Sequence, residues 1–441
     1  MCLIIRLFSV AVAQEATMTS NILDGMRITV DPGHGYSAAY DSFREGPGGE
    51  REEWINLRVA LVLVKKLEAA GAHVFLTRDT DRDLSLGGRA VLTKKHNSDL
   101  LIGIHHNGSP RDSGLDYPIV YFWGEAAQNP ASVDFGQILL AQMRKHLTFA
   151  QPSGGGVYSD FLIFPKGTSL LRNTIQATPG IIGEAGFFTH PTAEQRLKQK
   201  AYNELEAETY YQAIVQYAKL GIPRVELLTP KAHDGLNHQS QLTFQLSDGL
   251  GAHSFDPSTI RVLQDDQIIE HEWDPENGRV TVSPSLDHYQ LTQADQPRPL
   301  TLSLRIFART RAGNALHPKR FYFETEAGLK WRITQDWKIA YQSGIEAYQR
   351  WKSDYLAKQV DLSKKETWTA CRDALVTTLH HLRLSLTLQP CHPHARAAEQ
   401  HILYCLEHQR DMLGLDNKDA ISTQTKRVKE LYPVQREPQD K

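Results

Sequence analysis

The pattern of hydrophobic and polar residues divides the chain into three regions. From Met26 to about Leu220, short apolar runs typical of buried strands alternate with patterns typical of helices. The predicted strands are Met26–Val30, Leu100–Ile104 and Gly180–Gly183, and the predicted helices are Trp54–Ala70, Val133–Leu147 and Thr192–Leu220. Strands that alternate with helices predict an α/β domain over residues 26–222, with a mainly parallel sheet flanked by helices.

The second region, residues 225–325, has an all-β pattern. Short strand candidates are separated by clusters of Gly, Pro, Asp and Asn, and this spacing is typical of a β-sandwich. The candidates are Gln241–Leu246, Thr259–Leu263, Arg279–Val282, Leu300–Ile306 and Phe321–Phe323. The segment Arg309–Asn314 precedes the last candidate, and the region loosely resembles bacterial immunoglobulin-like (Ig-like) modules. That resemblance implies a spacer or an adhesion platform. A passive spacer is preferred, because such a fold says little about function.

The third region, residues 326–441, predicts an α-helical C-terminal region with no further strand. Five aromatic residues fall on one stripe at helical spacing, which is typical of core packing. They are Trp337, Tyr341, Tyr348, Trp351 and Tyr355. Thr367–Leu388 and Ala395–Leu413 predict a helical hairpin. The pattern of this region assigns it no function.

The first sixteen residues, MCLIIRLFSVAVAQEA, are mostly apolar and are interpreted as a signal peptide. The run Ala11–Ala13 before Gln14 resembles a signal-peptidase site, although a poorly ordered N-terminus is an alternative. After cleavage three cysteines would remain, namely Cys371, Cys391 and Cys405. A disulfide between two of them is expected in an exported protein. Use as a metal site with the nearby histidines fits no standard zinc spacing.

Composition and charge narrow the class of protein. A chain of 441 residues is too long for one core, and 41% hydrophobic with 23% charged residues is ordinary for folded protein. A net charge of -2 provides no basic field, so no nucleic-acid partner is expected. After the N-terminus no apolar run approaches the roughly 18–20 residues of a membrane span, so no transmembrane span is expected.

Candidate metal ligands follow the predicted strands of the first region. The run ITVDPGHG ends a strand with His34, LLIGIHHN ends another with His105, and Glu52 lies at the start of a predicted helix. Two histidines and one carboxylate are a standard donor set for catalytic zinc, with one position left open for water. Functional sites of open α/β sheets form at the carboxyl ends of the strands, where both histidines fall.

A fourth segment adds a candidate catalytic carboxylate. The run PGIIGEAGF is strand-like and places Glu184 near its end. A carboxylate next to an activated water can take its proton and later return it to a leaving amine. Each of the four residues alone has an ordinary structural explanation, and the prediction depends on all four occurring at one edge of the same sheet.

The first region resembles the zinc-dependent N-acetylmuramoyl-L-alanine amidases of the Amidase_3 type. Five blocks occur in that family's order: ITVDPGHG, EREEWINL, LTRDTDRDLSLGGRA, SDLLIGIHHN and LLRNTIQATPGIIGEAGFFTHPTAE. The resemblance covers about residues 26–220. It implies that His34, Glu52 and His105 bind Zn²⁺ and that Glu184 is catalytic. The implied reaction is hydrolysis of the bond between N-acetylmuramic acid and L-alanine in peptidoglycan or muropeptides, in the periplasm or cell envelope.

Several positions remain open within this resemblance. Glu52 has the family's spacing to Asn56 and Leu57, but Glu50 and Glu53 are rival acidic ligands. His106 is expected to lie next to the metal ligands without binding the metal itself, although substrate contact or metal binding are alternatives. Arg78 and Arg89 are expected to pin loops through nearby aspartates such as Asp79, Asp81 or Asp83, with substrate carboxylates as the alternative. Asp31 is a candidate to orient a ligand histidine.

Other functions remain as alternatives to the amidase. A zinc peptidase on the stem peptide would use the same donor set, and another divalent ion would accept it. A non-catalytic cell-wall binding or scaffold protein is the alternative from a different class. One clear helix, and no occluding helix, is expected between Asn107 and Glu184. An envelope protein partner is expected to bind through residues 225–441.

Overall fold

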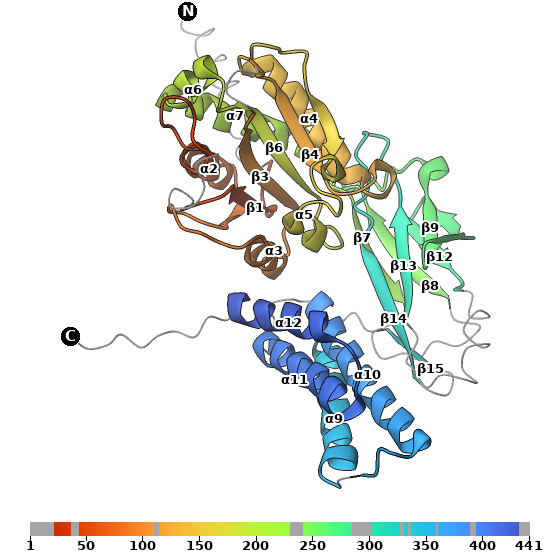
Figure 1. Cartoon of the computed structure of the whole chain (residues 1–441). Helices are drawn as coiled ribbons and strands as arrows, with labels where there is room; N and C mark the ends of the chain where they lie inside the picture. Colours follow the sequence, from red (N-terminus) through yellow and green to blue (C-terminus); the bar gives the residue numbers. More distant parts are fainter. Residues whose placement is uncertain are drawn as a thin grey trace, which may run out of the picture. The chain divides into compact units, whose positions relative to one another are not determined.

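The computed structural model describes most of the chain (Figure 1). The described residues are 22–36, 44–109, 114–229, 241–284, 301–326, 330–333, 337–358, 360–388 and 394–431. The predicted signal peptide and Cys391 lie outside them. Two compact units are present. The first comprises Met1–Arg224, Ser247–Ile260 and Phe307–Lys319, and the second comprises Val225–Leu246, Arg261–Ile306 and Arg320–Lys441.

A six-stranded sheet forms the centre of the first unit, in the order β2-β1-β3-β6-β4-β5. The strands are β1 (Arg27–Pro32), β2 (His73–Leu76), β3 (Leu100–Asn107), β4 (Pro118–Phe122), β5 (Gly156–Ser159) and β6 (Gly180–Phe187). Strands β2, β1, β3 and β6 run parallel, whereas β4 runs antiparallel to β6 and parallel to β5. The predicted mainly parallel sheet is therefore confirmed.

Helices cover both faces of this sheet. They are α2 (Glu52–Ala69), α3 (Leu86–Lys95), α4 (Pro130–His146), α5 (Ser169–Thr174), α6 (Pro191–Leu197) and α7 (Lys200–Lys219). Helices α2, α4 and α7 share one apolar core with Leu100, Ile102 and Ile104 of β3. Leu101 faces the other way, into a smaller cluster with residues of α3 and α5. Successive strand residues thus point to opposite faces, and both faces are buried.

The prediction of one continuous helix over Thr192–Leu220 is wrong, because the range contains two helices. The structure divides it into α6 and α7, with extended backbone at Gln199, where φ is -84° and ψ is 127°. No glycine or proline marks the break, so the sequence pattern runs through it without interruption. Between Asn107 and Glu184 the described residues form α5 as well as the expected helix α4.

The second unit contains two antiparallel sheets. One has the order β10-β9-β13-β14-β15 and the other has the order β11-β12-β8-β7. The strands are β7 (Arg224–Thr229), β8 (Leu242–Ser247), β9 (Arg261–Gln264), β10 (Gln267–Ile269), β11 (Glu272–Asp274), β12 (Arg279–Val282), β13 (Thr301–Phe307), β14 (Arg320–Glu326) and β15 (Lys330–Ile333). Phe244 of one sheet contacts Phe321 of the other, with ring centroids 5.0 Å apart. Strand β15 lies beyond Glu326, so the expectation of no further strand there is wrong.

The C-terminal residues are helical, as predicted. The helices are α9 (Trp337–Trp351), α10 (Lys365–Leu388), α11 (Ala395–Leu413) and α12 (Lys418–Leu431), with a π-helical turn at Lys352–Leu356. Tyr348 and Trp351 of the aromatic stripe are buried in the core of this bundle. Cys371 and Cys405 are both buried and free, so they do not form the expected disulfide with each other. The Cys371 sulfur instead accepts a hydrogen bond from the Trp351 indole at 3.4 Å.

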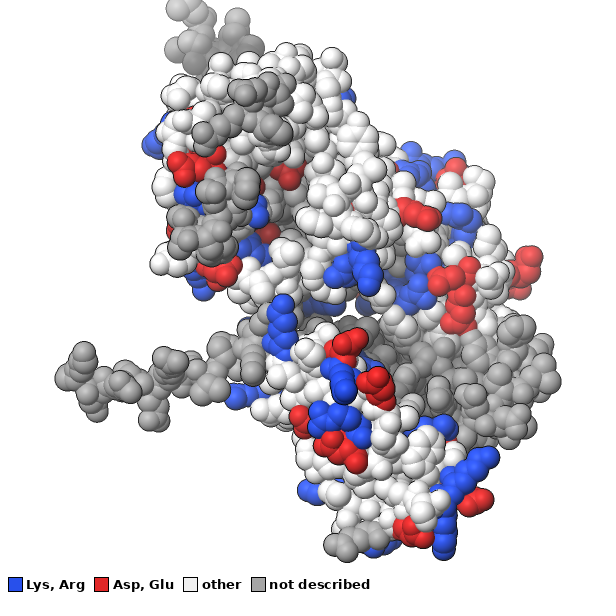
Figure 2. All heavy atoms as spheres, in the orientation of Figure 1, with Lys and Arg blue, Asp and Glu red and all other residues white. Residues whose placement is uncertain are grey.

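The described part of the chain contains no membrane-spanning helix, and the face drawn in Figure 2 has no extended basic surface. Every helix among the described residues is too short or too polar to cross a membrane. On the face drawn in Figure 2, lysine and arginine are interspersed with aspartate and glutamate. That face therefore carries no large single-sign patch of charge.

Candidate active site

The first candidate ligand, His34, lies in a tight turn directly after β1. Its backbone is left-handed, with φ of 59°, and Gly35 follows with φ of 132°. A Cβ atom on Gly33 would lie 2.2 Å from the His105 ring, so only glycine lets the turn approach β3 this closely. The sequence of this turn therefore brings two histidines from different strands together.

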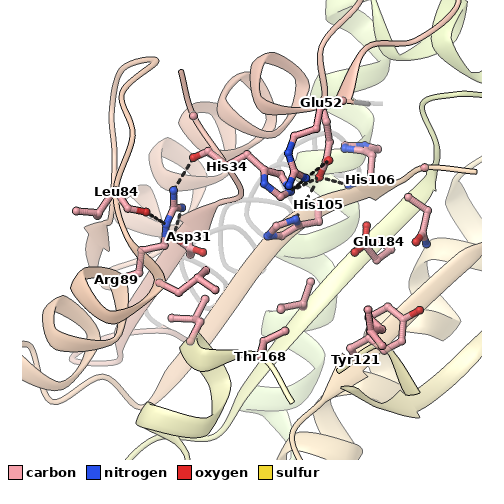
Figure 3. A pocket seen from close by; sticks show the side chains of 18 of the residues that line it. Asp31, His34, Glu52, Leu84, Arg89, His105, His106, Tyr121, Thr168 and Glu184 are labelled. Atoms are coloured by element: carbon pink, nitrogen blue, oxygen red, sulfur yellow. Dashed lines mark hydrogen bonds and ion pairs between the residues drawn. The ribbon is translucent and has the colours of Figure 1, made fainter. Parts of the chain in front are cut away.

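Glu52 lies between the two histidines (Figure 3). Its Oε1 atom is 3.1 Å from Nε2 of His34 and 3.1 Å from Nδ1 of His105. One potential ligand atom from each of the three residues lies within 4.8 Å of the others. Among the described residues, this is the group of His, Cys, Asp and Glu side chains that could hold a metal ion.

The electrostatics of the group suit a divalent cation. Burial acts to raise the pKa of Glu52, but the charge of His34 and hydrogen bonds from both histidines outweigh it and hold the pKa well below its usual range. Burial lowers the pKa of His34. Burial also acts to lower the pKa of His105, but the hydrogen bond to Glu52 and the charges of nearby carboxylates outweigh it and raise this pKa. An ionised carboxylate and two imidazole nitrogens, converging in a buried site, are the donor types that zinc accepts. The residues present therefore fit the ion that the sequence predicted.

Glu184 faces the same pocket from β6. It is the register partner of His105 in the parallel pairing of β3 with β6. Its Oε2 atom is buried and has no hydrogen-bond partner. Burial, helped by the charge of Glu52, raises the pKa of Glu184 to about 7. A carboxyl group with a pKa near neutrality can both take up and release a proton in that range.

The four residues line one cavity of about 510 Å³ (Figure 3). The polar part of its lining includes the candidate ligands, Arg44, Asp83, Arg89 and Asn107. Apolar residues from separate segments of the chain complete the lining. Its apolar residues are Leu84, Leu86, Tyr121, Ile163, Phe164, Leu170 and Ile182.

Two buried arginines fix the segments that carry the ligands. Arg78 donates hydrogen bonds to backbone carbonyls of Pro32, Gly33, Glu53 and Thr80 at 2.8–3.1 Å. It thereby joins the His34 turn to the first turn of α2. These contacts support the structural role expected for Arg78, but its partners are carbonyl groups and not the expected aspartates.

Arg89 makes a similar set of contacts beside the same turn. It donates to Asp31 at 2.7 Å and to the carbonyls of Pro32, His34 and Leu84. Asp31 also accepts from the Thr77 hydroxyl. Asp31 Oδ1 is thus engaged by an arginine and a threonine, whereas the sequence suggested that Asp31 orients a ligand histidine.

The structure separates Glu52 from its two rivals. Glu50 pairs with Arg58 at 2.7 Å, and Glu53 pairs with Arg51 at 2.8 Å. Neither belongs to the metal-competent group. Glu52 is the acidic side chain that reaches both histidines.

His106 is directed away from the metal-competent group. Its Nδ1 atom lies 2.8 Å from Oδ1 of Asn56, and its Nε2 atom lies 3.1 Å from Oε2 of Glu206. Both nitrogens are engaged and the side chain is completely buried. His106 therefore connects α2, β3 and α7, and it has no nitrogen left for metal.

Sequence reasoning missed several residues of the pocket. Arg44 donates to Nε2 of His34 at 2.9 Å and lies 3.5 Å from Oε2 of Glu52. The sequence around Arg44 has no periodicity from which its position could be inferred. Ile163 and Phe164 belong to the apolar run FLIF, which precedes Pro165. That run was a usable signal, although it suggests burial more readily than a pocket rim.

The first unit has a mainly parallel sheet, with a His/Glu/His group that could hold a metal ion at its carboxyl edge and a buried carboxyl beside that group. The fold and the site together define an α/β domain with the arrangement of a hydrolytic site. Residues 28–216 match the Amidase_3 family, described as N-acetylmuramoyl-L-alanine amidase. This part of the chain is a domain of the N-acetylmuramoyl-L-alanine amidase family of hydrolases. The match ends at residue 216, within the first unit, and covers no residue of the second unit.

Individual relatives resemble the same part of the chain. A probable cell wall amidase, LytH, of Staphylococcus epidermidis is 26% identical over 208 residues, which cover 46% of this chain and 62% of the relative. The germination-specific N-acetylmuramoyl-L-alanine amidase of Bacillus subtilis is 26% identical over 217 residues, which cover 44% and 81%. This chain therefore spans less than two thirds of the staphylococcal relative. An N-acetylmuramoyl-L-alanine amidase structure from Clostridium difficile is 24% identical, with a TM-score of 0.39, and covers 44% of this chain and 98% of that one.

Proposed function

We propose that the first unit is a zinc-dependent amidase that cleaves the bond between N-acetylmuramic acid and the L-alanine of the peptidoglycan stem peptide. The observation that supports this most strongly is the convergence of His34, Glu52 and His105 beside the buried carboxyl of Glu184. The family of residues 28–216 is described by the same reaction. A peptidase that cuts within the stem peptide would use a similar donor set, and the family match favours the amidase.

His34, Glu52 and His105 would hold the metal through the atoms that converge in the structure. When bound, a zinc ion supplies Lewis acidity to the scissile carbonyl and lowers the pKa of the attacking water. Arg78 and Arg89 keep the His34 turn in place by binding its backbone carbonyls. The donor set is thereby preorganised by contacts that do not involve substrate.

Glu184 would act as general base and then as general acid. Its carboxylate would accept a proton from the attacking water and return it to the departing alanine nitrogen. Oε2 of Glu184 is free of hydrogen bonds, so no competing donor has to be displaced. Its raised pKa suits both directions of proton transfer near neutral pH. The reaction would proceed without a covalent enzyme intermediate.

The place of action and the domain organisation belong to the same proposal. Residues 26–222 would form the catalytic domain, and residues 225–325 and 326–441 would be appended to it as a spacer and a helical region. With a substrate in the cell wall, the enzyme would be exported and would act in the periplasm or cell envelope. The convergence of four functional side chains in one pocket favours catalysis over a purely binding or scaffold role.

The test is a digestion of purified peptidoglycan and of a soluble muropeptide, with the metal content of each variant measured. Wild type is expected to hold about one zinc per chain and to release intact stem peptides. Glu184→Gln is expected to keep its zinc and to lose at least about a hundredfold in rate, because the proton carrier is removed. Glu52→Gln is expected to lose both zinc and activity.

The matched control is Glu45→Gln, which neutralises an exposed glutamate outside the pocket. It should retain zinc and activity. A Glu184→Gln variant that cleaves at the wild-type rate would remove Glu184 from the mechanism. Cleavage by a protein that binds no metal would remove the metal from it.

A further inference from the structure

A strip of exposed apolar side chains runs from the catalytic pocket onto the surface of the first unit. Five of the twelve large apolar side chains that are exposed among the described residues fall within Tyr158–Phe164. They are Tyr158, Phe161, Leu162, Ile163 and Phe164, and Leu162 is the most exposed at 73%. Single exposed apolar residues need no explanation, but a contiguous group of this kind marks a contact surface. We call these five residues the apolar strip.

The backbone beneath the apolar strip is firmly held. The buried carboxylate of Asp160 accepts hydrogen bonds from the amide and hydroxyl of Thr168, at 2.7 and 2.9 Å. The Trp123 indole and the Arg172 guanidinium both donate to the carbonyl of Lys166. Since these contacts close the segment into a fixed turn, its side chains are presented to the outside in a defined arrangement.

The apolar strip is continuous with the catalytic pocket. Ile163 and Phe164 line the cavity that contains His34 and Glu184, whereas Phe161 and Leu162 lie beyond its lining. Phe161 contacts Trp123 edge to face, with ring centroids 5.6 Å apart. A ligand that occupies the pocket and extends past Phe164 would therefore continue along Leu162 and Phe161.

The apolar character of the strip favours contact with the sugar part of the substrate. This step rests on the proposed function, in which the substrate joins a glycan to a peptide. The peptide carries carboxylates, which suit the guanidinium group of Arg44 in the cavity lining. A pyranose ring presents C–H groups on its faces, and such faces pack against aromatic and aliphatic side chains.

We propose that the apolar strip binds the glycan strand of the substrate on the side of the pocket formed by Ile163 and Phe164. The strip adds contacts only for sugars beyond the muramic acid at the scissile bond. It therefore makes the enzyme prefer muramoyl peptides embedded in a longer glycan over muramoyl peptides that carry a single sugar.

The test compares two soluble substrates that share one stem peptide. One carries a single N-acetylmuramic acid, and the other carries a tetrasaccharide of alternating amino sugars. Leu162→Ser is expected to lower the ratio of kcat/KM for the tetrasaccharide to kcat/KM for the single sugar by at least about fivefold, through loss of apolar contact area. Leu162→Phe keeps an apolar side chain and should keep the ratio. Ile268→Ser, which removes an apolar side chain that is 68% exposed in the second unit, should also keep it.

Melting midpoints and zinc content show whether each variant is folded and loaded. If Leu162→Ser lowers both kcat/KM values equally, or neither, the assignment of the strip to the glycan is wrong. A direct binding measurement separates this inference from the proposed function. Two inactive proteins are compared, Glu184→Gln and the double variant Glu184→Gln/Leu162→Ser. Each is co-sedimented with glycan strands from which the stem peptides have been removed.

If Leu162→Ser weakens glycan binding at least about fivefold, the glycan assignment is supported. This holds even if wild type cleaves neither substrate. In that case only the proposed function fails. The same proteins are mixed with vesicles of equal parts phosphatidylglycerol and phosphatidylcholine. Vesicle binding that depends on Leu162, together with glycan binding that does not, would overturn the inference and assign the strip to a membrane surface.

Discussion

At the scale of single residues, Arg78 positions the candidate metal ligands without belonging to the metal-competent group itself. Its guanidinium is completely buried and donates to carbonyls on both ligand-bearing segments. A planar guanidinium can bind several carbonyls at fixed angles, which a lysine ammonium cannot reproduce. The position of the His34 turn relative to α2 therefore depends on this side chain.

Arg78→Lys is expected to weaken zinc binding by about tenfold or more, because the hydrogen bonds that hold the His34 turn against the first turn of α2 are lost. The variant should also lose roughly 2–4 kcal/mol of stability, since several buried carbonyls are left without a donor. Competition with a chelator measures the first effect and denaturant unfolding measures the second. Arg82→Lys, at a mostly exposed arginine, is the control. Equal zinc affinity in wild type and Arg78→Lys would show that the turn holds its shape without Arg78.

His317 links stability to pH at a position away from the metal-competent group. Burial, with a smaller effect of Lys319, lowers the pKa of His317 to about 4 from its usual 6.5. Between these values the unfolded chain binds more protons than the folded one. The stability that the neutral ring contributes is therefore fully present above pH 6.5 and is lost as the pH falls towards 4.

His317→Leu is expected to flatten this dependence. Wild type should lose roughly 2–3 kcal/mol more than the variant between pH 6.5 and 4, which is the part of the free energy of the pKa shift that is expressed in this pH range. Urea unfolding at several pH values measures it. Parallel pH profiles for the two proteins would contradict a histidine that its surroundings keep neutral at this position.

The individual ligands were predictable because their positions follow from topology. His34 and His105 come directly after apolar strands, and parallel neighbouring strands end at one edge of a sheet. Arg44 could not be predicted in the same way, since it belongs to no predicted strand or helix and the sequence around it has no periodicity. The roles of Arg78 and Asp31 depend on which side chains a buried network pairs, and the sequence does not show that pairing.

At the scale of elements, the segment Phe307–Lys319 is packed as part of the first unit. Asp134 of α4 accepts hydrogen bonds from Arg309 at 2.9 Å and from the amide of Ala315 at 2.8 Å. The Asn314 side chain donates to the carbonyls of Tyr217 and Gly221 at the end of α7. The chain between β13 and β14 thereby satisfies helix-terminal carbonyls of the amidase domain.

Asp134→Ala is expected to cost roughly 1–3 kcal/mol of stability, because two donors of this segment lose their shared acceptor. Hydrogen exchange should rise at the amide of Ala315, while the amides of β3 stay protected. The control is Asp79→Ala, at an exposed aspartate with a 3.7 Å ion pair, which should change stability by less than about 0.5 kcal/mol. Equal effects of the two substitutions would show that the segment is held by other contacts.

The elements that the sequence pattern predicted are the long or strongly apolar ones. Helix α11 was predicted with its observed bounds, and β3 and β6 were found as uninterrupted apolar runs. The pattern missed β2 and β5, which lie at the two edges of the sheet and lack the fully buried apolar run by which β3 and β6 were recognised. It missed α3, whose second and third residues are glycines that weaken a helical signal.

At the scale of the whole molecule, composition and pattern indicated the kinds of structure in the correct order. An α/β region, an antiparallel β region and a helical region follow one another in the chain. The sequence did not indicate that two segments of the β region pack as part of the first unit. Such packing depends on contacts between residues more than a hundred positions apart, such as Asp134 with Arg309, which no local pattern encodes.

The central claim concerns which bond the whole protein cleaves, and the fate of the water oxygen tests it most directly. A muramoyl peptide is hydrolysed by the zinc-loaded full chain in water enriched in oxygen-18, and both products are analysed by mass spectrometry. Attack at the lactyl amide places the label in the carboxylate of the muramic acid product and leaves the intact stem peptide unlabelled. That is the result we predict. Label in a carboxylate of a shortened peptide would show a peptidase, and an uncleaved substrate would contradict the proposed amidase activity.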